Sequence, residues 1–232
     1  MFVVESVLVI CLVSIFPLLD KVIYDKLARG EIRKNLFLMI GITWSWILAG
    51  LIIYIMKSRG VGLEEIGLVK PDLDRYGETM SGLWVGACIG SVASPLFFWH
   101  MSRSEKGRTK LRNMIRSFKA ILPSSSLDRW VFAALAVTAG VCEEVIYRSF
   151  LFHYFSEAPF HIDGILLVAV SGAIFGLAHL YQGKLGVLQT TVMGLALGAI
   201  FMATGSLMIP IIVHTFIDLK FCLIPESVVR SA

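Results

Sequence analysis

Residues 129–155 read RWVFAALAVTAGVCEEVIYRSFLFHYF, a run that is apolar except for a few polar side chains. Its charged residues are Arg129 at the start and Glu143, Glu144 and Arg148 further along. A transmembrane helix needs about 20 mostly apolar residues, so this run is long enough to cross a bilayer. Ionisable groups at such a depth are costly and survive mainly as paired or functional groups. The run therefore predicts a membrane helix with functional ionisable residues.

The composition of the whole chain supports the same class of protein. The 232 residues are 56% hydrophobic and 16% charged, with a mean hydropathy of +0.77. Soluble domains average about a quarter charged residues, so a water-soluble protein, a disordered chain and a collagen are excluded. The four cysteines show no C-x-x-C spacing, which excludes a disulfide scaffold. A net charge of +4 is too small to indicate a nucleic-acid partner.

The pattern of apolar runs predicts an all-α, polytopic transmembrane bundle of about seven spans. The expected spans are 2–19, 36–56, 79–99, 129–155, 162–180, 185–204 and 206–224. The first span lacks a basic leading segment and a cleavage site, so we interpret it as a retained helix. Pro17 is expected to end it. The protein is thus predicted to be a multi-pass integral membrane protein, and its setting is the cytoplasmic membrane.

The charges of the loops predict the orientation, because short loops rich in Lys and Arg stay on the cytoplasmic side. Loops 20–35 and 100–128 are strongly basic, whereas acids outnumber basic residues in loop 57–78 and loop 156–161 holds no Lys or Arg. Seven spans then place the N-terminus outside and the C-terminus in the cytoplasm. Within 100–128, apolar residues recur at helical spacing between basic ones, which predicts an interfacial amphipathic helix; the apolar residues are Leu111, Met114, Ile115, Phe118 and Leu122.

Polar residues inside the later spans fall at helical spacing. Glu144 and Arg148 are four apart and are predicted to form an ion pair on one helix face. Glu143 is rotated by about 100° from its neighbour and is free to face a cavity. The fifth span carries Phe175 and His179 at the same spacing.

The seventh span adds His214 and Asp218, again four residues apart, followed by Lys220. If the three helices converge, Glu143, His179, His214 and Asp218 meet in a low-dielectric pocket where a water can be activated.

The series E-E-x-x-x-R, F-x-x-x-H and H-x-x-x-D, each on its own apolar helix, resembles the CPBP family of intramembrane proteases. This family includes the type II CAAX prenyl endopeptidases and is also called the Abi family. The resemblance covers roughly residues 128–220, with a weaker likeness at 63–68. The matching residues are Glu143, Glu144, Arg148, Phe175, His179, His214 and Asp218.

The resemblance implies an endopeptidase that cleaves a membrane-associated protein or peptide, either CAAX-like or hydrophobic. Glu143 and His179 would activate the attacking water, and His214 with Asp218 would stabilise the oxyanion. Glu144 and Arg148 would fix Glu143, and Phe175 is a candidate substrate contact. The family commonly has Asn at position 218, so Asp218 would be either protonated or an acceptor for the ring N–H of His214.

Metal dependence stays open at this point, because Glu143, His179 and His214 are acceptable zinc ligands. No other cofactor is implied. Depth poses a difficulty: counted from the cytoplasmic ends of their spans, Glu143 lies about 20 Å in, whereas His179 lies near the surface.

Two other functions are compatible with intramembrane acids and histidines. One is a proton-coupled transporter or channel, and the other is a non-catalytic immunity or binding protein. We expect N-terminal helices and a basic loop over 1–127, the catalytic core over 128–224 and a short tail over 225–232. Gly172, Gly176, Gly194 and Gly198 are expected to let helices approach closely.

Overall fold

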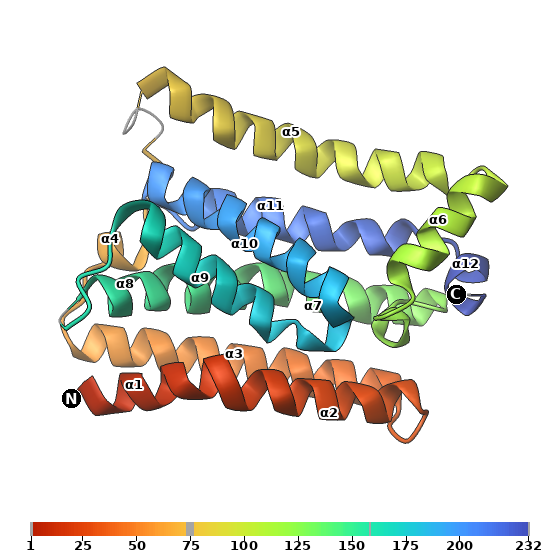
Figure 1. Ribbon diagram of the computed structural model, residues 1–232, viewed down its shortest axis with the longest axis horizontal. Coiled ribbons are helices and arrows are strands. Elements are labelled where there is room, and N and C mark those ends of the chain that lie inside the picture. The colour runs from red at the N-terminus through yellow and green to blue at the C-terminus, as the bar shows by residue number, and fades with distance from the viewer. Residues whose placement is uncertain (1, 73–76, 158, 232) are drawn as a thin grey trace.

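The computed structural model describes residues 2–72, 77–157 and 159–231, and in these ranges the chain is helical without strands (Figure 1). The predicted all-α bundle is confirmed. The longer elements are α1 (Phe2–Ile10), α2 (Phe16–Ala28), α3 (Lys34–Ser58), α5 (Gly77–Met101), α6 (Glu105–Ile115), α7 (Ser126–Glu144), α8 (Leu151–Ser156), α9 (Gly164–Ala178), α10 (Gly183–Thr204) and α11 (Met208–Leu219). Short turns complete the chain: η1 (Cys11–Ile15), α4 (Leu63–Ile66), η2 (Lys119–Ile121), η3 (Val145–Phe150), η4 (Leu180–Gln182), η5 (Lys220–Leu223) and α12 (Glu226–Arg230).

Each predicted span coincides with a helix, although the lengths differ. In the described part of the chain, four helices are long and apolar enough to cross a membrane: Val3–Ala28, Lys34–Ser58, Ser126–Ser156 and Leu180–Thr204. The helix α9 has only 15 residues and α11 only 12. These two helices are too short to cross the roughly 30 Å hydrocarbon core alone.

The first helix passes Pro17 instead of ending there, so the expected end of the first span is wrong. A π-turn, η1, precedes the proline, and Pro17 lies in the first turn of α2, which continues to Ala28. Proline is tolerated in a first turn because its missing N–H has no helical partner there. As a result, Asp20 lies within a membrane helix and not in a loop.

The helix α7 lies at the centre of the bundle, in contact with α3 and α11, while α5 packs on α11 and α9 packs on α10. Figure 1 shows α1–α2 and α3 along one edge of the bundle and α5 along the opposite edge. The α2–α3 turn, α6 and the C-terminus lie at one end, and the N-terminus, α4 and the α8–α9 loop lie at the other. The two strongly basic loops thus share one end of the molecule.

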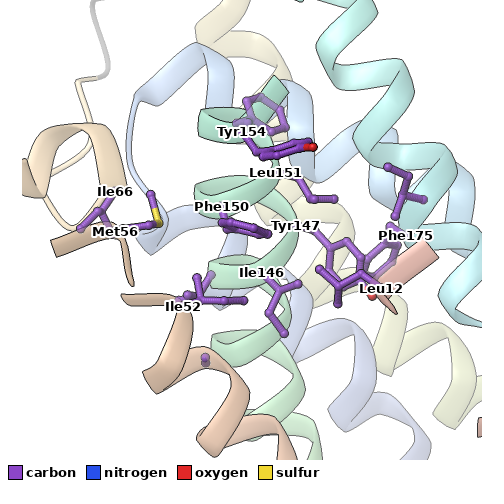
Figure 2. Close-up of a cluster of buried hydrophobic side chains, with 14 of the residues drawn as sticks. Leu12, Ile52, Met56, Ile66, Ile146, Tyr147, Phe150, Leu151, Tyr154 and Phe175 are labelled. Carbon is purple, nitrogen blue, oxygen red and sulfur yellow. The ribbon is translucent and has the colours of Figure 1, made fainter. Parts of the chain in front are cut away.

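The main hydrophobic core surrounds η3, the π-turn that continues α7 (Figure 2). All six residues of η3 are buried. Around them lie Leu12 of η1, Ile52 and Met56 of α3, Ile66 of α4 and Phe175 of α9. Because side chains from these four elements fix this turn, Arg148 within it is held in one position.

The amphipathic segment of loop 100–128 forms α6 and η2, with Ser104 capping α6 by accepting a hydrogen bond from the backbone N–H of Gly107. Its apolar face contacts the protein's own second core: Leu111 and Ile115 are fully buried, and Phe118 and Leu122 are buried beside them. Met114 alone of the predicted apolar face is exposed. The segment therefore closes the basic end of the bundle with its apolar face against protein and not against lipid.

Glycines bring α9 and α10 together, as expected. A Cβ atom added to Gly194 would lie 3.0 Å from Cα of Gly172, and one added to Gly176 would collide with the hydroxyl of Thr191. Gly198 faces Val168 and Phe152 at ordinary contact distance. Close approach of this kind is what small residues at a spacing of four permit in membrane helices.

Candidate active site

Glu144 and Arg148 form the predicted ion pair, with both side chains fully buried. Arg148 Nη1 donates to Glu144 Oε1 at 2.9 Å, and Nη2 donates to the carbonyl oxygen of Gly194 at 3.2 Å. The guanidinium also lies over the ring of Phe175, 4.5 Å from its centroid. Arg148 thus links η3 to α9 and α10.

The buried acid Glu144 also binds His214, which the sequence did not predict. His214 Nδ1 donates to Glu144 Oε1 at 2.7 Å, so one carboxylate oxygen receives both the arginine and the imidazole. Asp218 lies on the other side of the ring, with Oδ2 3.6 Å from Nε2, too far for a direct hydrogen bond. The residue that orients His214 is therefore Glu144, and not Asp218. Glu144 and Arg148, which were predicted to fix Glu143, form their hydrogen bonds with His214, with each other and with the backbone of Gly194.

His179 lies at the C-terminal cap of α9. Its Nδ1 is 2.8 Å from the carbonyl oxygen of Phe175. A carbonyl oxygen only accepts, so Nδ1 carries the proton and, in the neutral ring, Nε2 presents a lone pair. The ring also lies near Phe175 and Tyr181, at centroid distances of 4.8 and 5.9 Å. Nε2 lies 3.9 Å from Glu143 Oε2.

Glu143 lies close to both His179 and His214. Its Oε2 atom is 3.8 Å from His214 Nε2 and 3.9 Å from His179 Nε2. These separations are too long for direct hydrogen bonds. The Glu143 side chain is 25% exposed, whereas that of Glu144 is completely buried. As predicted, three helices converge and Glu143 faces a cavity.

The expected mismatch in depth between Glu143 and His179 does not occur, because α9 is short. His179 follows directly after α9, which begins at Gly164, so it lies about 22 Å from the α8–α9 loop. Glu143 lies 13 residues before the end of α8 at Ser156, which corresponds to about 20 Å from the same loop. The depth that was counted from the cytoplasmic ends of the spans was wrong, because α9 ends before it reaches that side of the bundle.

Phe175 is fully buried and contacts Arg148, His179 and His214. A side chain with no exposed surface does not contact a substrate in this arrangement. Its position instead supports the ion pair and both imidazoles, and its carbonyl oxygen fixes the proton of His179.

A cavity of about 610 Å³ opens beside Glu143, His179, His214 and Asp218. Its walls come from α5, α6, η2, α7, η4, α10, α11 and η5, and most of the lining side chains are apolar, including Phe98, Phe118, Phe132, Leu197 and Phe221. Sequence reasoning assigned no site role to several polar residues of this lining, among them Tyr181, Gln182 and Lys220. Lys220 carried a signal, since it is ionisable within an apolar run; the other two lie in a turn whose position depended on the length of α9.

The donor set does not fit a tetrahedral zinc ion as it is placed. Zinc lies about 2.0–2.2 Å from nitrogen and oxygen ligands, so two ligands of one ion lie roughly 3.4 Å apart. Glu143 Oε2 lies farther than that from both imidazoles. In the described ranges, no group of three or more His, Cys, Asp or Glu side chains is placed to hold a metal ion.

Comparison with known proteins supports the resemblance seen in the motifs. Residues 125–219 match the family model described as type II CAAX prenyl endopeptidase Rce1-like. This segment runs from the cap of α7 to the end of α11 and includes every residue of the cluster. No curated protein and no solved structure matches the chain.

Proposed function

We propose that this chain, whose residues 125–219 match the family model of the type II CAAX prenyl endopeptidases, hydrolyses a peptide bond with a water activated by Glu143 and His179. The observation that carries the proposal is the meeting of Glu143 Oε2 with the two imidazole Nε2 atoms at 3.8 and 3.9 Å beside a cavity. A carboxylate that shares a water with an imidazole lone pair is an arrangement for general-base catalysis.

In the proposed reaction, the water between Glu143 and His179 attacks the carbonyl carbon of the scissile bond. Glu143 takes one proton from this water, and His179 Nε2 accepts a hydrogen bond from it, which aims the oxygen at the carbonyl carbon. The carbonyl becomes a tetrahedral oxyanion. Glu143 then passes its proton to the leaving nitrogen, and the C–N bond breaks.

His214 is proposed to stabilise the oxyanion. It carries both ring protons in this mechanism: Nδ1–H donates to Glu144, and Nε2–H donates to the oxyanion. A donor that is fixed before the reaction can contribute a few kcal/mol to the transition state. Glu144 and Arg148 hold the ring in place, and because both are fully buried they do not contact the substrate.

The proposed substrate is a membrane-associated peptide with a CAAX-like C-terminus, whose cysteine carries a prenyl chain. The family description supports a prenylated substrate. The largely apolar lining of the 610 Å³ cavity suits a lipidated or hydrophobic peptide better than a hydrophilic one.

The test is cleavage of an S-farnesyl CAAX-like peptide by the purified protein in detergent, followed by mass spectrometry of the products. Glu143→Gln and His179→Ala are each expected to lower kcat by at least a hundredfold, while Glu157→Gln, a change on the exposed α8–α9 loop, leaves it unchanged. Full activity of either site variant contradicts the proposal.

The metal content of the same preparation decides between water activation by these residues and zinc chemistry. We expect less than one metal ion per ten molecules and cleavage that is insensitive to a chelator. One bound zinc per chain, with activity lost on its removal and restored on its return, would refute the metal-independent mechanism.

A further inference from the structure

Lys220 lines the active-site cavity, but the proposed mechanism assigns it no role. It is the first residue of η5, directly after α11. It lies in the same cavity as Glu143, His179 and Asp218, and in the described lining it is the one Lys or Arg residue.

The ammonium group of Lys220 is held between aromatic rings. Nζ lies 5.1 Å from the ring centroid of Phe98 on α5 and 5.0 Å from that of Phe221 on η5. Both rings also line the cavity. Cation–π contacts of this length orient a cation, and they leave its N–H donors available to a ligand.

Within the described residues, Lys220 forms no salt bridge within 4.0 Å and no hydrogen bond. Asp218 is the nearest acid in sequence and lies within electrostatic reach of Lys220. Its carboxylate lies 3.6 Å from His214 instead of forming an ion pair with Lys220. A cation in an apolar cavity is stabilised strongly by an anion that reaches it, because the charge-assisted hydrogen bond replaces lost hydration.

The spacing along α11 relates Lys220 to the position of cleavage. His214 and Lys220 are six residues apart, which corresponds to about 9 Å along the helix axis. An extended peptide advances about 3.3 Å per residue. A peptide that runs extended along α11 with its scissile carbonyl at His214 therefore reaches the level of Lys220 after about three residues.

We propose that Lys220 binds the C-terminal carboxylate of the substrate and so directs cleavage to a bond about three residues before the chain end. This inference rests on the proposed function. It makes Lys220 a specificity-determining residue, one that would distinguish the terminal tail of a protein from an internal hydrophobic segment.

The test compares two S-farnesyl CAAX-like peptides that differ only at the C-terminus, one a free acid and the other an amide. With the wild-type protein, the acid is expected to have a kcat/KM about tenfold or more above the amide, mainly through KM. Lys220→Met brings the acid/amide ratio close to one, whereas Lys220→Arg keeps it well above one. Lys184→Met, at an exposed position outside the cavity, leaves both rates unchanged.

Each outcome has a defined meaning. Equal cleavage of acid and amide by the wild type overturns the inference about Lys220 and leaves the proposed function standing. A Lys220→Met variant that slows both peptides by the same factor also overturns it, and would assign Lys220 to packing or to lipid phosphates. No cleavage of either peptide by folded wild-type protein overturns the proposed function, and this inference with it.

Discussion

At the scale of single residues, Glu143 and Glu144 are neighbours in the chain but have separate surroundings. Successive residues of a helix point about 100° apart, so Glu144 lies in the core with Arg148 while Glu143 lies at the cavity. The four-residue spacing predicted the first of these contacts. It could not predict that Glu144 also holds His214, since that contact joins residues 70 positions apart.

Asp218 differs from the asparagine that is common in the family, and its position beside His214 Nε2 gives a testable consequence. An ionised carboxylate near the proposed oxyanion would repel it, whereas an amide can donate a hydrogen bond. We expect Asp218→Asn, which removes the charge and adds a donor, to cleave the farnesyl peptide faster than the wild type, and Asp218→Ala, which only removes the charge, to cleave it at about the wild-type rate. Equal losses in the two variants would show that the carboxylate itself is needed.

At the scale of the elements, the length of α9 determines whether the site can form. The apolar run 162–180 predicted a helix in the correct place, but it could not show that the helix ends at Ala178. The turn η4 follows, and Gly183, the first residue of α10, adopts a positive φ of 75°. Glycine enters this region of backbone conformation without steric cost. This turn holds His179 at the depth of Glu143.

Close packing of α9 on α10 is expected to be as important as the catalytic side chains. Gly176→Ala would drive a methyl group into the Thr191 hydroxyl and toward the backbone of α10. It should lower the free energy of unfolding by about 1–3 kcal/mol and reduce cleavage, because His179 lies three residues away. Equilibrium unfolding in detergent measures the first effect.

Gly41→Ala is the matched control, since a Cβ atom there meets nothing within 4 Å. It is expected to be neutral or slightly stabilising, as alanine favours helix over glycine by about 1 kcal/mol. If the two variants have the same stability, the close approach of α9 and α10 does not contribute as argued.

At the scale of the whole molecule, the basic segments and several of the elements that line the cavity lie at the same end of the bundle. The basic segments before α3 and around α6 lie at one end (Figure 1), and the cavity is lined by α6, η2 and η5, which belong to that end. Hydropathy and loop charge predicted that the basic segments share one end, because both depend on residue types alone. The cavity depends on which helix faces pack against each other, and local sequence patterns do not predict this packing.

The orientation in the membrane can be tested with single cysteines in a variant that lacks the native ones. Lys106→Cys on α6 should react with an impermeant maleimide only from the cytoplasmic side, and Glu157→Cys only from the opposite side. Both positions are exposed in the structure. Labelling of both from the same side of sealed vesicles would rule out the proposed topology.

The central claim is that Glu143 and His179 act together on one water molecule. Residues that act as a unit have non-additive effects on catalysis. The most direct measurement is therefore the kcat of farnesyl-peptide cleavage by Glu143→Gln, His179→Ala and the double variant. We predict that the double variant is no slower than the slower single variant, whereas a loss equal to the product of the two single losses would contradict a shared water.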